Sequence, residues 1–224
     1  MISYPNIDPV AIDLGFISIY WYGISYVVGI LTAWFLLKYR VRQSQLLLDN
    51  QQIGDLVFFV MLGIIIGGRL GSIIFYNFSY YLEHPLEIFY IHMGGMSFHG
   101  GLIGVIIAVW FFSFNRSISF FRVTDFIAPV VPIGLGCGRI ANFINGELWG
   151  GPSNLPWAMI FPDPAAGGIS RHPSQLYEAF LEGLVLFIIL WWFSRIPRPV
   201  RATSGSVSYT HLRAHETLRY LVCR

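Results

Sequence analysis

The stretch PIGLGCGRIANFINGELWG, from Pro132 to Gly150, is apolar and rich in glycine, yet it carries Arg139, Asn142 and Glu147 toward its C-terminal end. An arginine at the centre of a membrane helix costs roughly 2.5 to 3.5 kcal/mol to insert, so such a residue is expected to serve a function. The stretch therefore predicts a polar site inside a membrane-spanning helix.

The composition of the whole chain supports a membrane location. Of the 224 residues, 55% are hydrophobic and only 12% are charged, and the mean hydropathy is +0.60. Soluble domains carry roughly 25% charged residues. The net charge of +2 is too small to indicate nucleic-acid binding. The two cysteines, Cys137 and Cys223, have neither metal-ligand spacing nor a disulfide framework. We expect an all-α, polytopic integral membrane helix bundle without a metal site.

Five largely apolar segments are long enough to cross the hydrocarbon core of a bilayer, which takes about 20 residues. They cover residues 16–37, 56–75, 98–114, 126–145 and 174–193. The N-terminus lacks the basic region of a signal peptide, so the first segment is expected to be retained. Lysines and arginines gather in the loops after the first, third and fifth segments, which predicts that these loops face the cytoplasm and the N-terminus lies outside. These residues are Lys38, Arg40, Arg42, Arg116, Arg122, Arg195, Arg198 and Arg201.

This orientation brings polar residues to a common depth. Tyr22, Arg69 and Arg139 each lie six or seven residues from the outer end of a segment, which corresponds to roughly 10 Å at the helical rise of 1.5 Å per residue. His99 begins the third segment, and Ser174 to Glu178 begin the fifth. We therefore expect one pocket that opens outward.

Glycines at four-residue spacing indicate how the helices pack. Small residues at this spacing let helix backbones approach closely in lipid, so we expect packing rather than ligand contact. Pro129 and Pro132 are expected to bend the fourth segment. The glycines are Gly63, Gly67 and Gly71, Gly100 with Gly104, and Gly134 with Gly138.

Each candidate site residue has a structural alternative. Arg139 and Asn142 share a helix face and suit a phosphate, but Arg139 could instead pair with an acid such as Glu182 to hold helices together. Arg69, beside packing glycines, allows the same alternative. The ordinary pKa of histidine, near 6.5, suits His99 to proton transfer, although a single histidine can also be just a hydrogen-bonded residue.

Five motifs taken together resemble those of the bacterial prolipoprotein diacylglyceryl transferases. The likeness runs in order from about Tyr4 to Ser204, and GRIANFINGELWG is close to the signature of that family. The motifs are WYGISY (residues 21–26), GGRLG (67–71), GGMSFHGGLIGV (94–105), DFIAPVVPIGLGCGRIANFINGELWG (125–150) and RHPSQLYEAFLEG (171–183).

The resemblance implies a multi-pass enzyme of the bacterial inner membrane with its active site toward the outer leaflet. Such an enzyme moves the diacylglyceryl group of phosphatidylglycerol onto the lipobox cysteine of a prolipoprotein, forms a thioether and releases glycerol 1-phosphate. The resemblance implies no metal and no cofactor, and seven spans in place of five.

The resemblance also implies site residues. We expect His99 to assist deprotonation of the cysteine thiol, and Arg139 with Arg69 to bind the phosphate. The implied catalytic residues are His99, Tyr22 and Glu147, and the implied phosphatidylglycerol ligands are Arg139, Asn142, Arg69 and Gly150.

The end of the chain departs from the family pattern. We expect residues 1–204 to form the transmembrane transferase domain, incomplete at its C-terminus. Residues 205–224, with SVSYTHLRAHETLRYLVCR, contain no run that could cross a bilayer and look like translated cloning or assembly sequence. Cys223, His211 and His215 are then expected to have no function, and transfer is expected to be impaired.

Two other function classes stay open at this point. A transporter or channel also uses intramembrane arginines, but its polar residues would lie at several depths. An assembly subunit without activity would use Arg139 for helix contacts only. Neither class accounts for the shared motifs.

Overall fold

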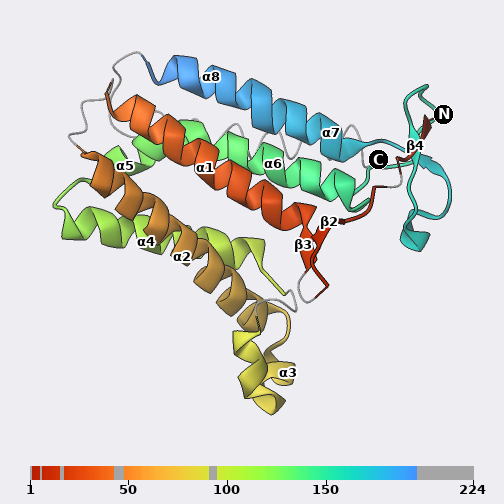
Figure 1. The fold of residues 1–224 in the computed structure, drawn as a ribbon, viewed down its shortest axis with the longest axis horizontal. Helices are drawn as coiled ribbons and strands as arrows, with labels where there is room; N and C mark the ends of the chain where they lie inside the picture. The colour runs from red at the N-terminus through yellow and green to blue at the C-terminus, as the bar shows by residue number, and fades with distance from the viewer. Residues whose placement is uncertain (1, 6, 16–17, 43–47, 91–94, 196–224) are drawn as a thin grey trace. The chain divides into compact units, whose positions relative to one another are not determined.

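The computed structural model describes residues 2–5, 7–15, 18–42, 48–90 and 95–195. It consists of two compact parts. The first part is formed by Met1–Gln43 with Asp125–Arg224, and the second part by Ser44–Thr124. The fold is mostly helical, as Figure 1 shows, and five helices among the described residues are long and apolar enough to cross a membrane. The chain is a multi-pass membrane protein, and the predicted all-α bundle is confirmed.

The helices and strands follow one another in this order. They are β1 (Ile2–Ser3), β2 (Val10–Asp13), β3 (Ser18–Tyr20), α1 (Trp21–Val41), α2 (Asn50–Phe75), α3 (Phe78–Glu83), η1 (Pro85–Phe89), α4 (Phe98–Asn115), α5 (Phe120–Ile127), η3 (Ala128–Val130), α6 (Val131–Ile144), β4 (Met159–Ile160), η4 (Pro164–Ala166), β5 (Ser170–Arg171), α7 (Ser174–Glu178), η5 (Ala179–Val185) and α8 (Leu186–Phe193).

Three predicted helix starts are wrong. The fourth span begins at Phe120 with α5, six residues before the predicted residue 126. α1 begins only at Trp21, because residues 18–20 form β3, which pairs antiparallel with β2. Tyr22 therefore lies at the start of the helix, and the depth of about 10 Å expected for it does not follow. α2 begins six residues before the predicted residue 56, because Asp49 forms a capping box with Gln52 that satisfies the amide groups of a polar first turn.

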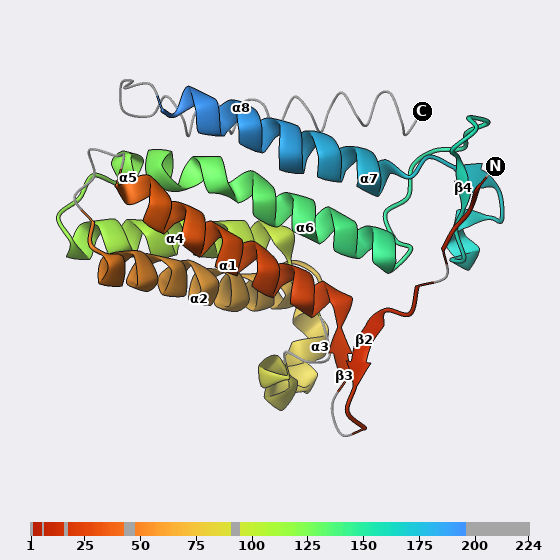
Figure 2. The same cartoon turned by 45° about the horizontal axis from the view of Figure 1, so that its top comes forward.

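In the first part, α6 lies between α1 and the continuous run α7, η5 and α8 (Figures 1 and 2). In the fourth span the chain changes to a 3-10 turn over Ala128–Val130, where Pro129 lies. The bend expected at the two prolines stays a prediction. At the end of α8, the Nη1 group of Arg40 on α1 donates to the Ser194 hydroxyl.

Short strands fasten the N-terminus to the segment between α6 and α7. β1 pairs parallel with β4, and β4 pairs antiparallel with β5. The Tyr4 hydroxyl donates to the main-chain oxygens of Phe143 and Ile144 at the end of α6, where helix carbonyls lack intrahelical partners. Burial raises the pKa of Tyr4. The end of α6 is thereby held in a defined position.

The second part is built on close contact between α2 and α4. A Cβ added at Gly63 would lie 2.5 Å from the Gly104 oxygen, and one at Gly71 would lie 2.5 Å from the Gly100 Cα. The packing role predicted for these glycines is confirmed. In the first part, the same prediction holds for Gly134, whose Cα would lie 3.3 Å from a Cβ added at Gly29 of α1, but it is wrong for Gly138, because a Cβ there would meet open space.

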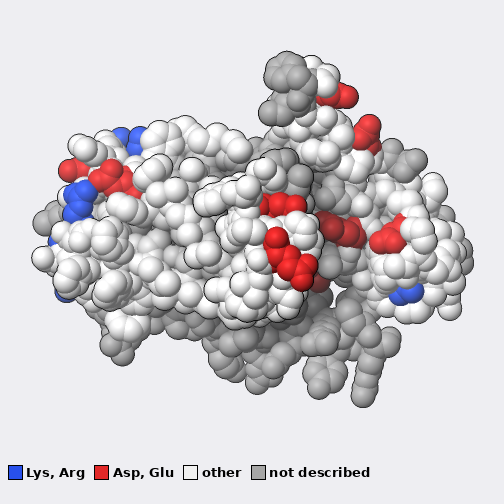
Figure 3. Space-filling model, turned by 90° about the horizontal axis from the view of Figure 1, so that it is seen from below, with Lys and Arg blue, Asp and Glu red and all other residues white. Residues whose placement is uncertain are grey.

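The surface of the helices is largely apolar. Figure 3 shows a face on which wide areas carry neither basic nor acidic side chains. Large side chains such as Phe35, Phe114 and Trp192 are more than half exposed. Water would disfavour such surfaces, whereas lipid tails match them.

Candidate active site

Arg139 lies in the C-terminal half of α6 and faces the run α7 to η5. Its Nε is 2.8 Å from a carboxylate oxygen of Glu178 and 3.8 Å from one of Glu182. The Arg139 side chain is 20% exposed, so the guanidinium is neither sealed in the protein nor open to solvent. The structural alternative of pairing with Glu182 is thus partly met, and Glu178 is the nearer acid.

Asn142, on the next turn of α6, has a different partner. Its side-chain amide donates to Glu147 at 2.8 Å, and Gln175 of α7 donates to the main-chain oxygen of Glu147. Asn142 and Gln175 are buried. Arg139 and Asn142 therefore do not share the common protein neighbour that their spacing suggested, but α6, the turn after it and α7 are joined in one polar network.

Glu147 and Gly150 belong to the turn that follows α6. Leu148 adopts a left-handed backbone with φ of 56°, which is strained for a residue with a branched side chain and is often found at functional sites. The Gly150 amide donates to His172, and the Arg171 guanidinium donates to the Gly150 oxygen. The turn is thus fixed to the segment before α7.

Ser174 also contributes to this fastening. Ser174 is the first residue of α7, and Pro173 is the residue at the cap position. The Ser174 hydroxyl donates to the Leu148 oxygen at 2.9 Å. It stabilises the strained turn rather than the helix end.

Tyr22 lies in the same part of the molecule, at the start of α1. Its ring packs edge to face on Tyr26, with the centroids 5.2 Å apart. Its role in catalysis stays a prediction.

Arg69 lies in the second part, on α2, and is buried with 5% exposure. Its Nε and Nη2 donate to the main-chain oxygens of Ile88 and Glu87 at 3.0 and 2.6 Å, and Nη1 donates to Gly95 at 3.4 Å. Its guanidinium also lies 5.1 Å from the Tyr81 ring centre. These contacts favour the structural alternative, in which Arg69 fastens the segment after α2. A direct contact with lipid phosphate stays a prediction.

His99 is the second residue of α4 and is exposed. The preceding Ser97 caps the helix by accepting a hydrogen bond from the Gly100 amide. This cap orients the first turn, so that the imidazole extends from a fixed backbone. A function for His99 as a base stays a prediction.

Residues 9–223 match the family model described as prolipoprotein diacylglyceryl transferase. The chain belongs to the prolipoprotein diacylglyceryl transferase family. It is 52% identical over 223 residues to the phosphatidylglycerol–prolipoprotein diacylglyceryl transferase of Bordetella avium, covering 99% of this chain and 83% of that protein. It is 58% identical to the protein of the same name from Methylococcus capsulatus, over 92% of this chain and 78% of that protein. It is 53% identical to the protein of the same name from Pseudomonas aeruginosa, over 92% of this chain and 76% of that protein.

The prediction that residues 205–224 are not native to such a transferase lies outside the described residues and stays a prediction. The family match itself extends to residue 223. The basic residues Arg198 and Arg201, used to predict orientation, also lie outside the described residues.

Three contacts of this family member escaped sequence reasoning. Glu178 is the nearer partner of Arg139, Gln175 reaches the Glu147 backbone, and Tyr4 holds the end of α6. The four-residue spacing of Glu178 and Glu182 was the available signal, since residues so spaced share one helix face. Tyr4 gave no signal, because its partners are backbone oxygens 139 and 140 residues away.

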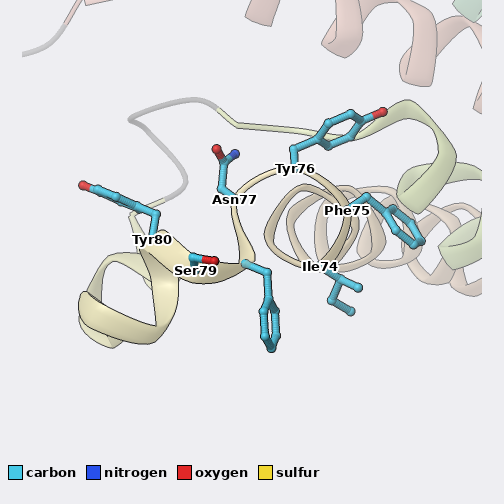
Figure 4. A pocket seen from close by; sticks show the side chains of 7 residues that line it. Ile74, Phe75, Tyr76, Asn77, Ser79 and Tyr80 are labelled. Carbon is cyan, nitrogen blue, oxygen red and sulfur yellow. The ribbon is translucent and has the colours of Figure 1, made fainter.

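A hollow in the second part lies where α2 ends and α3 begins. Figure 4 shows the side chains around it, which come from Ile74 to Tyr80. None of the predicted site residues lines it. Within the described ranges, no three His, Cys, Asp or Glu residues lie close enough together to hold a metal ion.

Proposed function

We propose that this chain transfers the diacylglyceryl group of phosphatidylglycerol to the lipobox cysteine of prolipoproteins, a step of lipoprotein maturation. The observation that carries the proposal is identity of 52% and 58% to proteins named for this reaction, over 99% and 92% of the chain. The position of Arg139 inside an apolar helix supports it independently, because an anionic headgroup in lipid needs a cationic partner.

The proposed reaction is a displacement at a glycerol carbon. The cysteine sulfur forms a bond to the diacylglycerol carbon, while the bond from that carbon to the phosphate oxygen breaks. The electron pair leaves with the phosphate as glycerol 1-phosphate, and the thiol proton passes to a base and then to solvent or the leaving group. A thiolate is needed because a thiol is a weak nucleophile.

We assign the roles as follows. His99 accepts the thiol proton, since an imidazole nitrogen can act as a general base. Arg139 binds the phosphate and stabilises the charge that develops on it. The Asn142 to Glu147 hydrogen bond and the fixed turn at Gly150 shape the site beside Arg139. Tyr22 adds a hydroxyl from α1.

The proposed setting is the bacterial inner membrane, with the N-terminus outside and the site open to the outer leaflet. The support is the bias of lysine and arginine toward the loops after the first, third and fifth spans. The proposed partners are phosphatidylglycerol, the lipobox peptide of a prolipoprotein and surrounding membrane lipids.

The test is a transfer assay with the membrane-embedded full chain, phosphatidylglycerol and a lipobox peptide. Mass spectrometry of the peptide should detect the thioether adduct, and the His99→Gln variant should form it roughly 100-fold more slowly, the lower range for general base catalysis. His84→Gln, on the exposed end of α3, is the matched control. No adduct from the wild-type chain would refute the transferase proposal, and full activity of His99→Gln would refute only the assignment of the base.

A further inference from the structure

Glu182 is a buried acid that the proposed reaction does not use. Its side chain is 1% exposed, and neither carboxylate oxygen has a hydrogen-bond partner among the described residues. It lies in the π-helical stretch Ala179–Val185, a rare geometry that is frequent at functional sites. A buried carboxyl without hydrogen bonds is costly, so its presence needs a reason.

The fold brings this acid to Arg139 through a close approach of two backbones. A Cβ added at Gly183 would lie 2.7 Å from the Gly136 Cα, so the helix α6 and the π-helical stretch meet without side chains between them. Glu182 precedes Gly183, and Arg139 follows Gly136 by almost one turn. The result is the distance of 3.8 Å between Arg139 Nε and Glu182.

Two carboxyl groups thus face one guanidinium, and they differ in their exposure and in their distance from it. Glu178 is 2.8 Å from Arg139 Nε and its side chain is 19% exposed, at the end of the short helix α7. Glu182 is farther away and enclosed. A phosphate that binds Arg139 adds a third anionic group beside the two carboxylates. Like charges gathered around one guanidinium repel one another strongly in a medium of low polarity. Of the two carboxylates, that of Glu178 is the more exposed, so it can leave Arg139 with the smaller rearrangement of the protein.

We propose that Glu182 is a positioning residue that holds the inner side of the Arg139 guanidinium, whereas Glu178 occupies Arg139 until the lipid phosphate displaces it. This inference rests on the proposed function, because it assigns the phosphate of phosphatidylglycerol to Arg139. It predicts opposite effects for the two acids. Removing the charge of Glu178 removes a competitor of the phosphate, whereas removing that of Glu182 lets the guanidinium leave its position.

The test measures the affinity of the full chain for phosphatidylglycerol, titrated into detergent micelles and followed by native mass spectrometry. Glu182→Gln keeps the side-chain shape and should weaken binding about tenfold, in keeping with the loss of one interaction with a charged group. Glu178→Gln should tighten binding severalfold. Glu83→Gln, an exposed acid of α3, is the matched control and should change nothing.

A second measurement separates positioning from a general loss of packing. In the background of Arg139→Gln, the further change Glu182→Gln should have no additional effect on affinity, because Glu182 acts through Arg139. Unchanged affinity in Glu182→Gln, or a full additional loss in the double variant, would overturn the proposal. If Glu182→Gln does not fold, Glu178→Gln decides, since equal or weaker binding by that variant contradicts displacement.

The outcome also distinguishes this inference from the proposed function. A wild-type chain that forms the thioether adduct while Glu182→Gln and Glu178→Gln bind the lipid like wild type would overturn the positioning role alone. A wild-type chain that binds no phosphatidylglycerol would overturn both.

Discussion

Arg69 and Arg139 look alike in the sequence, yet their surroundings differ in kind. Both lie near the end of an apolar span beside glycines. Arg69 donates to three main-chain carbonyl groups and is buried, whereas Arg139 faces two side-chain carboxylates and is partly exposed. Backbone carbonyls cannot move away without unfolding a segment, but a carboxylate can rotate. The contacts of Arg69 thus favour a structural role, whereas exchange of a carboxylate at Arg139 for a lipid phosphate is the role that we propose.

The largest effect expected from this comparison is on the transfer reaction of Arg139→Lys. Lysine keeps the charge but lacks the planar fork that binds a phosphate through two parallel hydrogen bonds. Losing about two charge-assisted bonds of roughly 1.5 kcal/mol each corresponds to a rate about 100-fold lower in the peptide transfer assay.

Arg116→Lys is the matched control, because Arg116 pairs with Asp55 at the opposite end of α4 from His99 and both side chains are about one third exposed. Its activity should stay near that of the wild type. If Arg139→Lys transferred as fast as this control, Arg139 would be a helix contact like Arg69, and the comparison would fail.

The second largest effect is expected on the free energy of unfolding, in the variant Arg69→Lys. One ammonium group cannot reach the carbonyl oxygens of Ile88, Glu87 and Gly95 together. Leaving one or two of these buried acceptors without a donor should lower the free energy of unfolding by about 2 kcal/mol, measured by denaturant titration in micelles. The affinity for phosphatidylglycerol should change less than threefold. A loss of affinity as large as that in Arg139→Lys would place Arg69 in the lipid site after all.

The same comparison explains how far the sequence predicted the fold. Apolar length and four-residue glycine spacing are local or periodic signals, so the five spans and the contact between α2 and α4 could be predicted. The start of α2 was missed because the capping box of Asp49 and Gln52 draws a polar turn into the helix. Hydropathy alone has no term for such a cap.

The site was less predictable, because its partners come from irregular backbone. The carbonyl groups that hold Arg69 belong to the segment around η1 and to Gly95, whose positions no periodicity announces. Likewise, the acids that face Arg139 lie where the backbone changes from α7, which ends at Glu178, to the π-helical stretch that contains Glu182, a change that the sequence does not indicate. Residue types near the end of a span therefore predict that a polar site exists. Whether an arginine there has structural or functional contacts becomes clear only from the three-dimensional structure.

The smallest effect concerns the segment that Arg69 fastens. The main-chain oxygen of Glu87 accepts a hydrogen bond from Arg69. The carboxylate of Glu87 accepts a second hydrogen bond, from the Tyr80 hydroxyl at 2.7 Å. This hydrogen bond raises the pKa of Tyr80 above its ordinary value of 10.0. Because the folded pKa is the higher one, the stabilisation is complete below the pKa of unfolded tyrosine and disappears as the pH rises through the folded pKa.

Tyr80→Phe should therefore expose the α3 to η1 segment to protease slightly faster than in wild type at pH 8, and the difference should vanish when the pH exceeds the folded pKa. The cleavage rate measured by mass spectrometry tests this. Tyr76→Phe is the control, since the Tyr76 hydroxyl makes no hydrogen bond within the described part of the chain. Equal cleavage of Tyr80→Phe and wild type at pH 8 would mean that Arg69 alone holds the segment, which would sharpen its contrast with Arg139.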